Sequence, residues 1–333
     1  MTAFGTTAAI FGCLGPTLSP DEQVFFRDAD PFGFIIFARN VDNPDQLRRL
    51  TSDLRAAVGR DALVLVDQEG GRVQRLRSPH WRDWTPPLDA ITAAPDLATA
   101  CRIMALRATI IASELRAVGI DANCAPVADI ATDATHPFLR NRCYGTDTTT
   151  VTAIARAVAG ACLTGGVLPV LKHMPGHGRA TGDTHLALPT VTTDAATLTA
   201  TDFAPFRALA DLPMAMTAHI VFSAHDAANP ATQSPRMIDI IRTDIGFQGL
   251  LMTDDLNMQA LSGTLADRTT LSLQAGCDIA LHCNGDMREM LAVATAAGPM
   301  RDGTLARAAR AIALRRPPPH IDIAAIEAAL AHA

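Results

Sequence analysis

The chain has 333 residues, of which 48% are hydrophobic and 19% charged, and its formal net charge is −6. That hydrophobic content excludes a disordered protein and suits a fold with many buried strands and helices. The acidic balance, without a basic stripe, argues against nucleic-acid binding and favours a small-molecule partner. No apolar run is long enough to span a bilayer, and the first residues lack the basic start of a secretory signal. The seven scattered cysteines indicate reduced thiols, so we expect a cytoplasmic protein without a membrane partner.

Short apolar runs alternate with segments of helical period, which is the pattern of a parallel sheet buried on both faces. The predicted strands are residues 8–14, 33–37, 62–66, 121–125, 168–171, 214–217, 250–252 and 278–282. The predicted helices between them are residues 44–58, 97–118, 148–164, 195–210, 235–244 and 259–275. Eight strands in this alternation favour an α/β fold, a (β/α)8 TIM-type barrel, over a doubly wound open sheet. We expect one catalytic barrel domain over 1–333, with 317–333 as a C-terminal helical extension, and we see no internal repeat.

Polar side chains follow nearly every predicted strand. They include Arg39, Asn40, Asp67, Glu69, Asp129, Lys172, His173, His219, Asp254, Asp255 and Asn284. Because the carboxyl ends of barrel strands meet at one rim, these side chains are expected to converge there on an active site. Successive strand residues point to opposite sides, so we expect Asp254 to face the barrel mouth and Asp255 to support a loop or the start of the following helix, which it could cap.

The segment after residue 171 is a glycine-rich loop with unusual chemistry. It contains Lys172, His173, His177, Asp183 and His185. Asp183 and His185 are close enough for the carboxylate to orient an imidazole that transfers protons. Imidazoles and carboxylates are also plausible zinc ligands, but their spacing matches no helical His-Glu-x-x-His signature. We therefore predict neither a metal ion nor a cofactor.

Four runs in this order resemble the family 3 glycoside hydrolases, and are most similar to the single-domain bacterial β-N-acetylglucosaminidases of peptidoglycan recycling. The runs are residues 67–73, 172–178 with 183–185, 216–219 and 252–256. The resemblance implies a retaining mechanism in which Asp254 forms a covalent glycosyl-aspartate. It also implies that His185 is the acid/base and that Asp183 orients it, like the Asp-His half of a serine-protease triad.

The resemblance further implies which residues contact the terminal N-acetylglucosamine. They are Asp67, Arg142, Lys172 and His173. Arginine and lysine donate hydrogen bonds and aspartate accepts them. The set can therefore bind a sugar hydroxyl both as hydrogen-bond acceptor and as donor. The sequence of residues 136–141, just before Arg142, differs from the one more common in the family.

The implied reaction is exo-acting release of N-acetylglucosamine from N-acetylglucosaminyl-1,6-anhydro-N-acetylmuramic acid and its peptides. Three alternatives stay open on the same fold: a β-N-acetylglucosaminide phosphorylase, a β-glucosidase and a non-catalytic sugar-binding protein.

Overall fold

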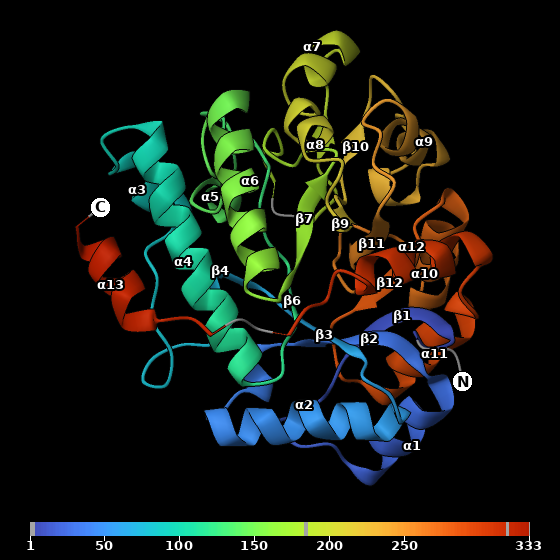
Figure 1. The fold of residues 1–333 in the computed structure, drawn as a ribbon. Coiled ribbons are helices and arrows are strands. Elements are labelled where there is room, and N and C mark those ends of the chain that lie inside the picture. Colours follow the sequence, from blue (N-terminus) through green and yellow to red (C-terminus); the bar gives the residue numbers. More distant parts are fainter. Residues whose placement is uncertain (1–3, 183–185, 318–319, 333) are drawn as a thin grey trace.

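Eight short parallel strands close into a barrel in the computed structural model, which describes residues 4–182, 186–317 and 320–332 (Figure 1). In order around the barrel they are β1 (Thr7–Gly12), β2 (Pro31–Ile36), β3 (Leu63–Val66), β6 (Ala122–Asn123), β7 (Leu168–Met174), β9 (Met214–Thr217), β11 (Leu250–Asp255) and β12 (Ile279–His282). This order is the sequence order, and β12 pairs with β1 to close the sheet. The predicted (β/α)8 fold is confirmed.

Helices surround the barrel, as Figure 1 shows. They are α1 (Pro20–Ala29), α2 (Pro44–Val58), α3 (Pro87–Thr92), α4 (Leu97–Ala117), α5 (Pro137–Arg140), α6 (Thr148–Thr164), α7 (Ala195–Ala200), α8 (Ala204–Ala208), α9 (Pro235–Thr243), α10 (Leu265–Ala275), α11 (Met287–Ala297), α12 (Asp302–Ile312) and α13 (Ile323–Ala331). Helices α2 and α6 have the predicted bounds, because Asn43 and Asp147 cap their first turns. In the described ranges, no helix combines the length and apolar character needed to cross a membrane.

The predicted helix over 195–210 is wrong, because the segment folds as the two short helices α7 and α8. Between them the buried Asp202 accepts a hydrogen bond from Arg179 Nε at 2.7 Å. Pro205 then lies in the first turn of α8, where its missing amide hydrogen costs nothing. A contact with a distant arginine, which local periodicity does not report, sets this break.

The predicted helix over 259–275 starts too early. Helix α10 begins at Leu265, where Thr264 and Asp267 form a capping box that satisfies the first free amides. The residues between β11 and α10 are turns at the barrel rim, so they are available to shape the site.

Two small sheets lie beyond the carboxyl ends of the barrel strands. One pairs β4 (Gln68–Gly70) with β5 (Val73–Gln74), and the other pairs β8 (Thr190–Val191) with β10 (Val221–Phe222). Gly70 turns the first hairpin with φ +95°, and a side chain at Gly70 would collide with the guanidinium of Arg107.

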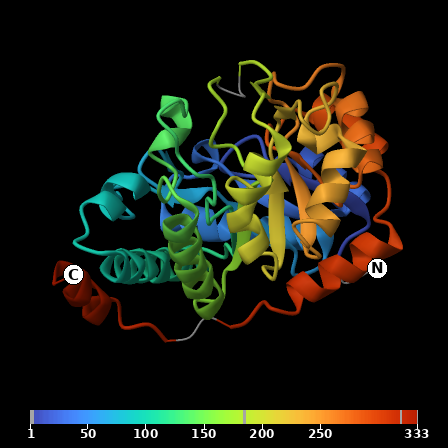
Figure 2. The same cartoon turned by 90° about the horizontal axis from the view of Figure 1, so that it is seen from above.

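Helix α13 lies beside α4, at the edge of the molecule (Figure 2). All of its described residues keep some solvent exposure, and Glu327 forms an ion pair with Arg82. The expected terminal helix therefore packs on a barrel helix rather than on the strands.

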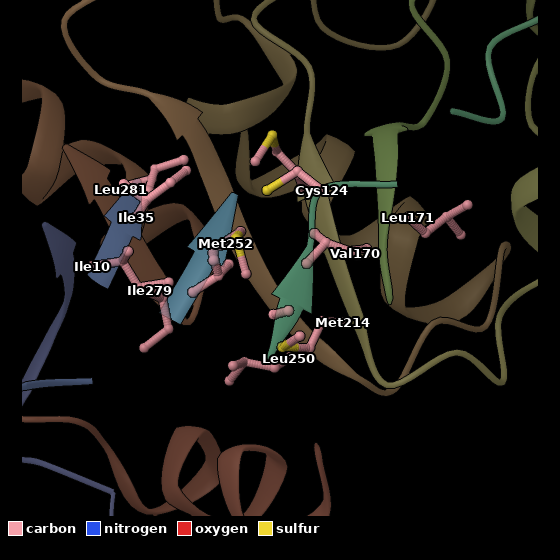
Figure 3. Packing of buried hydrophobic residues seen from close by; sticks show 14 of the residues in the cluster. Ile10, Ile35, Cys124, Val170, Leu171, Met214, Leu250, Met252, Ile279 and Leu281 are labelled. Carbon is pink, nitrogen blue, oxygen red and sulfur yellow. The ribbon is translucent and has the colours of Figure 1, made fainter. Parts of the chain in front are cut away.

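Buried aliphatic side chains fill the barrel, and Figure 3 shows part of this packing. Ile10, Val170, Leu250 and Ile279 come from four different strands and are inaccessible to solvent. Their layers separate the two ends of the barrel, as in other parallel barrels whose centre is a packed core.

Two buried aspartates join neighbouring strands at the amino-terminal end of the barrel, and we call them the aspartate clamps. Asp121, before β6, accepts a hydrogen bond from the amide of Val64 in β3 (2.8 Å) and donates its own amide to the Val64 carbonyl (3.0 Å). Asp278, before β12, makes the same two bonds with Leu251 in β11, at 3.0 and 2.8 Å. Arginines neutralise both carboxylates: Arg55, Arg116 and Arg315 at Asp121, and Arg242 and Arg307 at Asp278.

The clamps occupy equivalent places in the two halves of the barrel, at strands three and four and at strands seven and eight. Asp67 comes three residues after Val64, and Asp254 comes three residues after Leu251. Asp67 and Asp254 therefore stand at the same distance along the chain from a clamped residue, although β11 shifts its register against β12 between Met252 and Asp255. The sequence alone does not reveal this repeated strand pair.

Replacing the second clamp, Asp278→Ala, is expected to lower the free energy of unfolding by about 3 kcal/mol, because the buried carboxylate loses its hydrogen bonds and two half-buried arginines lose their counter-charge. Urea denaturation followed by circular dichroism measures the change. The matched control is Asp211→Ala, which removes an exposed bidentate partner of Arg156 and should cost less than about 1 kcal/mol. Equal losses in the two variants would contradict the clamp's importance.

Candidate active site

A pocket with a cavity volume of about 100 Å³ opens at the carboxyl ends of the barrel strands. Its walls bring together five predicted site residues from four regions of the chain: Asp67, Arg142, Lys172, His173 and Asp254. The other two predicted residues, Asp183 and His185, lie outside the described residues.

Lys172 and His173 belong to the strand rather than to a loop, because β7 continues to Met174. Their side chains are buried, and Lys172 Nζ donates to Asp67 at 2.8 Å and to Glu69 at 2.5 Å. Burial opposes the charge, yet these two carboxylates raise the pKa of Lys172 above its ordinary value. Lys172 is therefore positively charged at neutral pH, and its two carboxylate partners fix the direction of its ammonium group.

Glu69 joins the lysine to a second buried cation. Both Glu69 oxygens accept hydrogen bonds from Arg142, at 2.9 and 2.8 Å, which is a bidentate pair. Although burial alone would favour a neutral carboxyl, Arg142 and Lys172 lower the pKa of Glu69. Arg142 also lies 3.4 Å from His173 Nε2.

Asp67 at the end of β3 is shared between two cations. It pairs with Lys172 and also with Arg75 Nη2, at 3.0 Å. Burial would raise the pKa of Asp67, but Lys172 and Arg75 lower it instead, so the carboxylate is ionised. The Arg75 guanidinium also lies 4.9 Å from the ring centre of Phe37, an apolar wall of the pocket.

Asp129 fixes the orientation of His173. One Asp129 oxygen lies 2.7 Å from His173 Nδ1, which must be the donor to a carboxylate. The other oxygen accepts the backbone amides of His173 (3.3 Å) and His177 (2.7 Å). Burial next to His173 lowers the pKa of His177 to about 4, so this second imidazole is neutral at pH 7.

Asp254 stands at the end of β11 and reaches the pocket, as its strand position predicts. One of its oxygens accepts the amide of Asp255 at 2.8 Å. Burial favours the neutral form, but the neighbouring His173 and His219 hold the pKa of Asp254 below its ordinary value. The site therefore contains a half-buried, ionised carboxylate, which is what nucleophilic attack requires.

A buried polar chain supports the end of this strand. Thr217 lies 2.8 Å from the hydroxyl of Thr232, which lies 2.7 Å from His219 Nδ1. His219 Nε2 is 3.1 Å from the carbonyl oxygen of Asp255 and must donate to it. Burial lowers the pKa of His219, so a neutral imidazole with one fixed tautomer positions the residue after Asp254.

The chain matches the model of the glycosyl hydrolase family 3 N terminal domain over residues 23–316. The chain belongs to glycosyl hydrolase family 3. The prediction of a glycoside hydrolase is therefore confirmed.

Relatives of this family 3 enzyme cover most of its length. The beta-hexosaminidase of Methylococcus capsulatus is 38% identical over 280 residues, which is 83% of this chain and 82% of that protein. NagZ from Neisseria gonorrhoeae, solved in complex with N-trifluoroacetyl-D-glucosamine, has a TM-score of 0.86 at 29% identity over 100% of this chain and 98% of its own. A family 3 beta-N-acetylglucosaminidase from Paenibacillus sp. str. FPU-7 has a TM-score of 0.83 at 29% identity, and this chain covers 62% of that longer protein.

Sequence reasoning about this family 3 enzyme did not assign roles to four residues that hold the pocket together: Glu69, Arg75, Asp129 and His219. Glu69, Asp129 and His219 follow barrel strands and were expected at the rim, whereas Arg75 follows β5 of the small hairpin. Their individual roles depend on partners from other parts of the chain, which strand-end position does not give. In the described residues, no three histidine, cysteine or acidic side chains gather as a metal ion would need.

Of the two expected roles, Asp255 supports a loop and not the start of the following helix, which Thr264 caps. Asp255 Oδ1 accepts the amides of Asn257 (3.1 Å) and Cys283 (3.2 Å) and ties the rim turn to the end of β12. Burial raises the pKa of Asp255 from 3.8 to about 6.

This shift predicts a pH-dependent stability. Because the folded state binds the Asp255 proton more tightly than the unfolded chain does, ionisation costs stability above pH 6, and this cost disappears as the pH falls toward 4. Asp255→Asn should therefore be more stable than the parent protein at pH 8, by roughly 1–3 kcal/mol, and about equal to it near pH 4. Urea denaturation at both pH values measures this.

The control is Asp53→Asn, on the exposed face of α2, which should show no such difference between the two pH values. A constant offset of Asp255→Asn at both pH values would contradict the assignment.

Proposed function

We propose that this family 3 enzyme is an exo-acting retaining β-N-acetylglucosaminidase that releases terminal N-acetylglucosamine from N-acetylglucosaminyl-1,6-anhydro-N-acetylmuramic acid and its peptides. The observation that carries the proposal is the ionised Asp254 in a pocket at the barrel rim, next to paired Lys172 and Arg142. The names of the hexosaminidase relatives and the glucosamine derivative in the NagZ complex support the sugar. Cytoplasmic location stays a prediction from the cysteine pattern.

In the proposed first step, a carboxylate oxygen of Asp254 attacks the anomeric carbon. The bond from that carbon to the leaving-group oxygen breaks, and this oxygen takes a proton from the acid. In the second step, water gives its proton to the same base and its oxygen to the anomeric carbon, which frees Asp254. Two displacements on one carbon retain the β configuration.

We assign the acid/base role to His185 and its orientation to Asp183, as the sequence motif implies. Support comes from the described residues just before this segment. They follow the end of β7, which carries the pocket residues Lys172 and His173. These residues are attached to the barrel rim, where Thr135 Oγ1 donates to the Gly178 carbonyl at 2.5 Å.

The four proposed sugar contacts offer complementary hydrogen bonds. Asp67 offers carboxylate acceptors, while Lys172 and Arg142 offer only donors. His173 is fixed through Asp129, so its free ring edge has one orientation. Because these groups are already paired and buried, little reorganisation is needed when a sugar replaces water.

Asp254→Ala is expected to lower the release of the aryl group from 4-nitrophenyl N-acetyl-β-glucosaminide by at least about a thousand-fold, since the nucleophile is lost. A fluorinated glycosyl inhibitor should add its mass to the peptide that contains Asp254. Colorimetric rates and peptide mass spectrometry measure the two results. Asp239→Ala, at an exposed position of α9, is the control, and full activity of Asp254→Ala would contradict the proposal.

The acceptor in the second step is expected to be water rather than phosphate. The three cations that line the pocket, Arg75, Lys172 and Arg142, are each paired with a carboxylate, so none is left over for an anionic acceptor. Product analysis in phosphate buffer should yield free N-acetylglucosamine. A sugar 1-phosphate as main product would instead establish the phosphorylase.

A further inference from the structure

One arginine beside the pocket, Arg72, has no counter-charge among the residues that the structure describes. Arg72 lies between Gly71 and Val73 in the β4–β5 hairpin, and its side chain is exposed. The pocket arginines Arg75 and Arg142 pair with carboxylates at 3.0 and 2.8 Å. Arg72 has no carboxylate partner within the described part of the chain.

Its guanidinium is nevertheless held in place. It lies 4.2 Å from the ring centre of Phe138, which lines the pocket. The buried guanidinium of Arg142 lies 5.1 Å from the centre of the same ring. Phe138 therefore lies between Arg142 inside the pocket and Arg72 outside it. Cation–π attraction to the ring restricts the motion of the Arg72 guanidinium.

The position of Arg72 fits the leaving-group side of the substrate. In an exo-acting enzyme the terminal sugar fills the closed end of the pocket, so the rest of the substrate leaves through the mouth. Val73, next to Arg72 in the chain, is itself part of the pocket wall. A group attached to the second sugar would thus come close to the exposed guanidinium.

We propose that Arg72 binds a carboxylate on the leaving-group side of the substrate. A guanidinium fork matches a carboxylate with two parallel hydrogen bonds, and a residue ordered in advance loses little entropy on binding. This inference rests on the proposed function, since the muramic acid residue carries a lactyl carboxylate and its peptide carries others. Arg72 selects the substrate and takes no part in bond cleavage.

The test compares N-acetylglucosaminyl-1,6-anhydro-N-acetylmuramic acid with its lactyl methyl ester, which has no charge. The measured quantity is the ratio of kcat/KM for the acid to kcat/KM for the ester. Arg72→Gln should lower this ratio about ten-fold, and Arg72→Lys about three-fold, because lysine keeps the charge but lacks the fork. Arg49→Gln removes one exposed positive charge from α2 and should keep the parent ratio. Added salt should lower the ratio of the parent enzyme.

A peptide-bearing substrate distinguishes the two sources of carboxylate, because the peptide amidates the lactyl group. On the peptide-bearing substrate the ratio compares the free peptide carboxylates with their methyl esters. A change of the ratio on the disaccharide assigns the lactyl carboxylate, and a change seen only on the peptide-bearing substrate assigns the peptide. An unchanged ratio for Arg72→Gln on both substrates, or an equal change for Arg49→Gln, would overturn the inference.

The inference can fail separately from the proposed hydrolysis. Isothermal titration of the acid and the ester into Asp254→Asn, with and without Arg72→Gln, needs no turnover. Tighter binding of the acid that is lost with Arg72→Gln supports carboxylate recognition even if the parent enzyme does not cleave the disaccharide. Equal affinities for acid and ester in the presence of Arg72 would contradict it.

Discussion

Charge compensation inside the pocket is the constraint on which the site depends. Lys172 and Arg142 share the carboxylate of Glu69, and Lys172 also holds Asp67. Each of these groups is largely removed from water. A single unpaired charge in such a buried environment would cost several kcal/mol. The same pairing that makes the charges tolerable also fixes their directions. An ionised Asp254 can exist beside them because the neighbouring histidines offset its burial.

The amino-terminal end of the barrel contributes to stability, and the carboxyl end carries the candidate active site. At the amino-terminal end, the aspartate clamps Asp121 and Asp278 bind arginines and join strand pairs. At the carboxyl end, the same strand pairs present Asp67 and Asp254 to the pocket. Each clamp fixes the amino-terminal end of its strand pair, and in the second pair β11 shifts its register against β12 between Met252 and Asp255, where Asp254 stands. The buried charges of the pocket are thereby separated from the hydrogen bonds and ion pairs that join the strands at the other end.

Much of the fold and part of the site could be predicted from local patterns. Alternating apolar runs located the strands, and a polar residue after most of them indicated the rim where Asp254 and Lys172 lie. The errors occurred where a distant contact or a cap decides local structure. Asp202, which binds Arg179, lies where the helix predicted over 195–210 is interrupted, and the helix predicted over 259–275 begins only at the Thr264 cap.

The sequence by itself determined the strand and helix alternation, the family resemblance and the identity of the candidate nucleophile, because each depends on residue type and spacing along the chain. Only the tertiary structure decided which charges neutralise each other, that Asp129 orients His173, and that Arg72 is left unpaired on Phe138. Ion pairs and ring contacts join residues tens of positions apart. Their energies depend on burial and distance, which exist only once the barrel has closed.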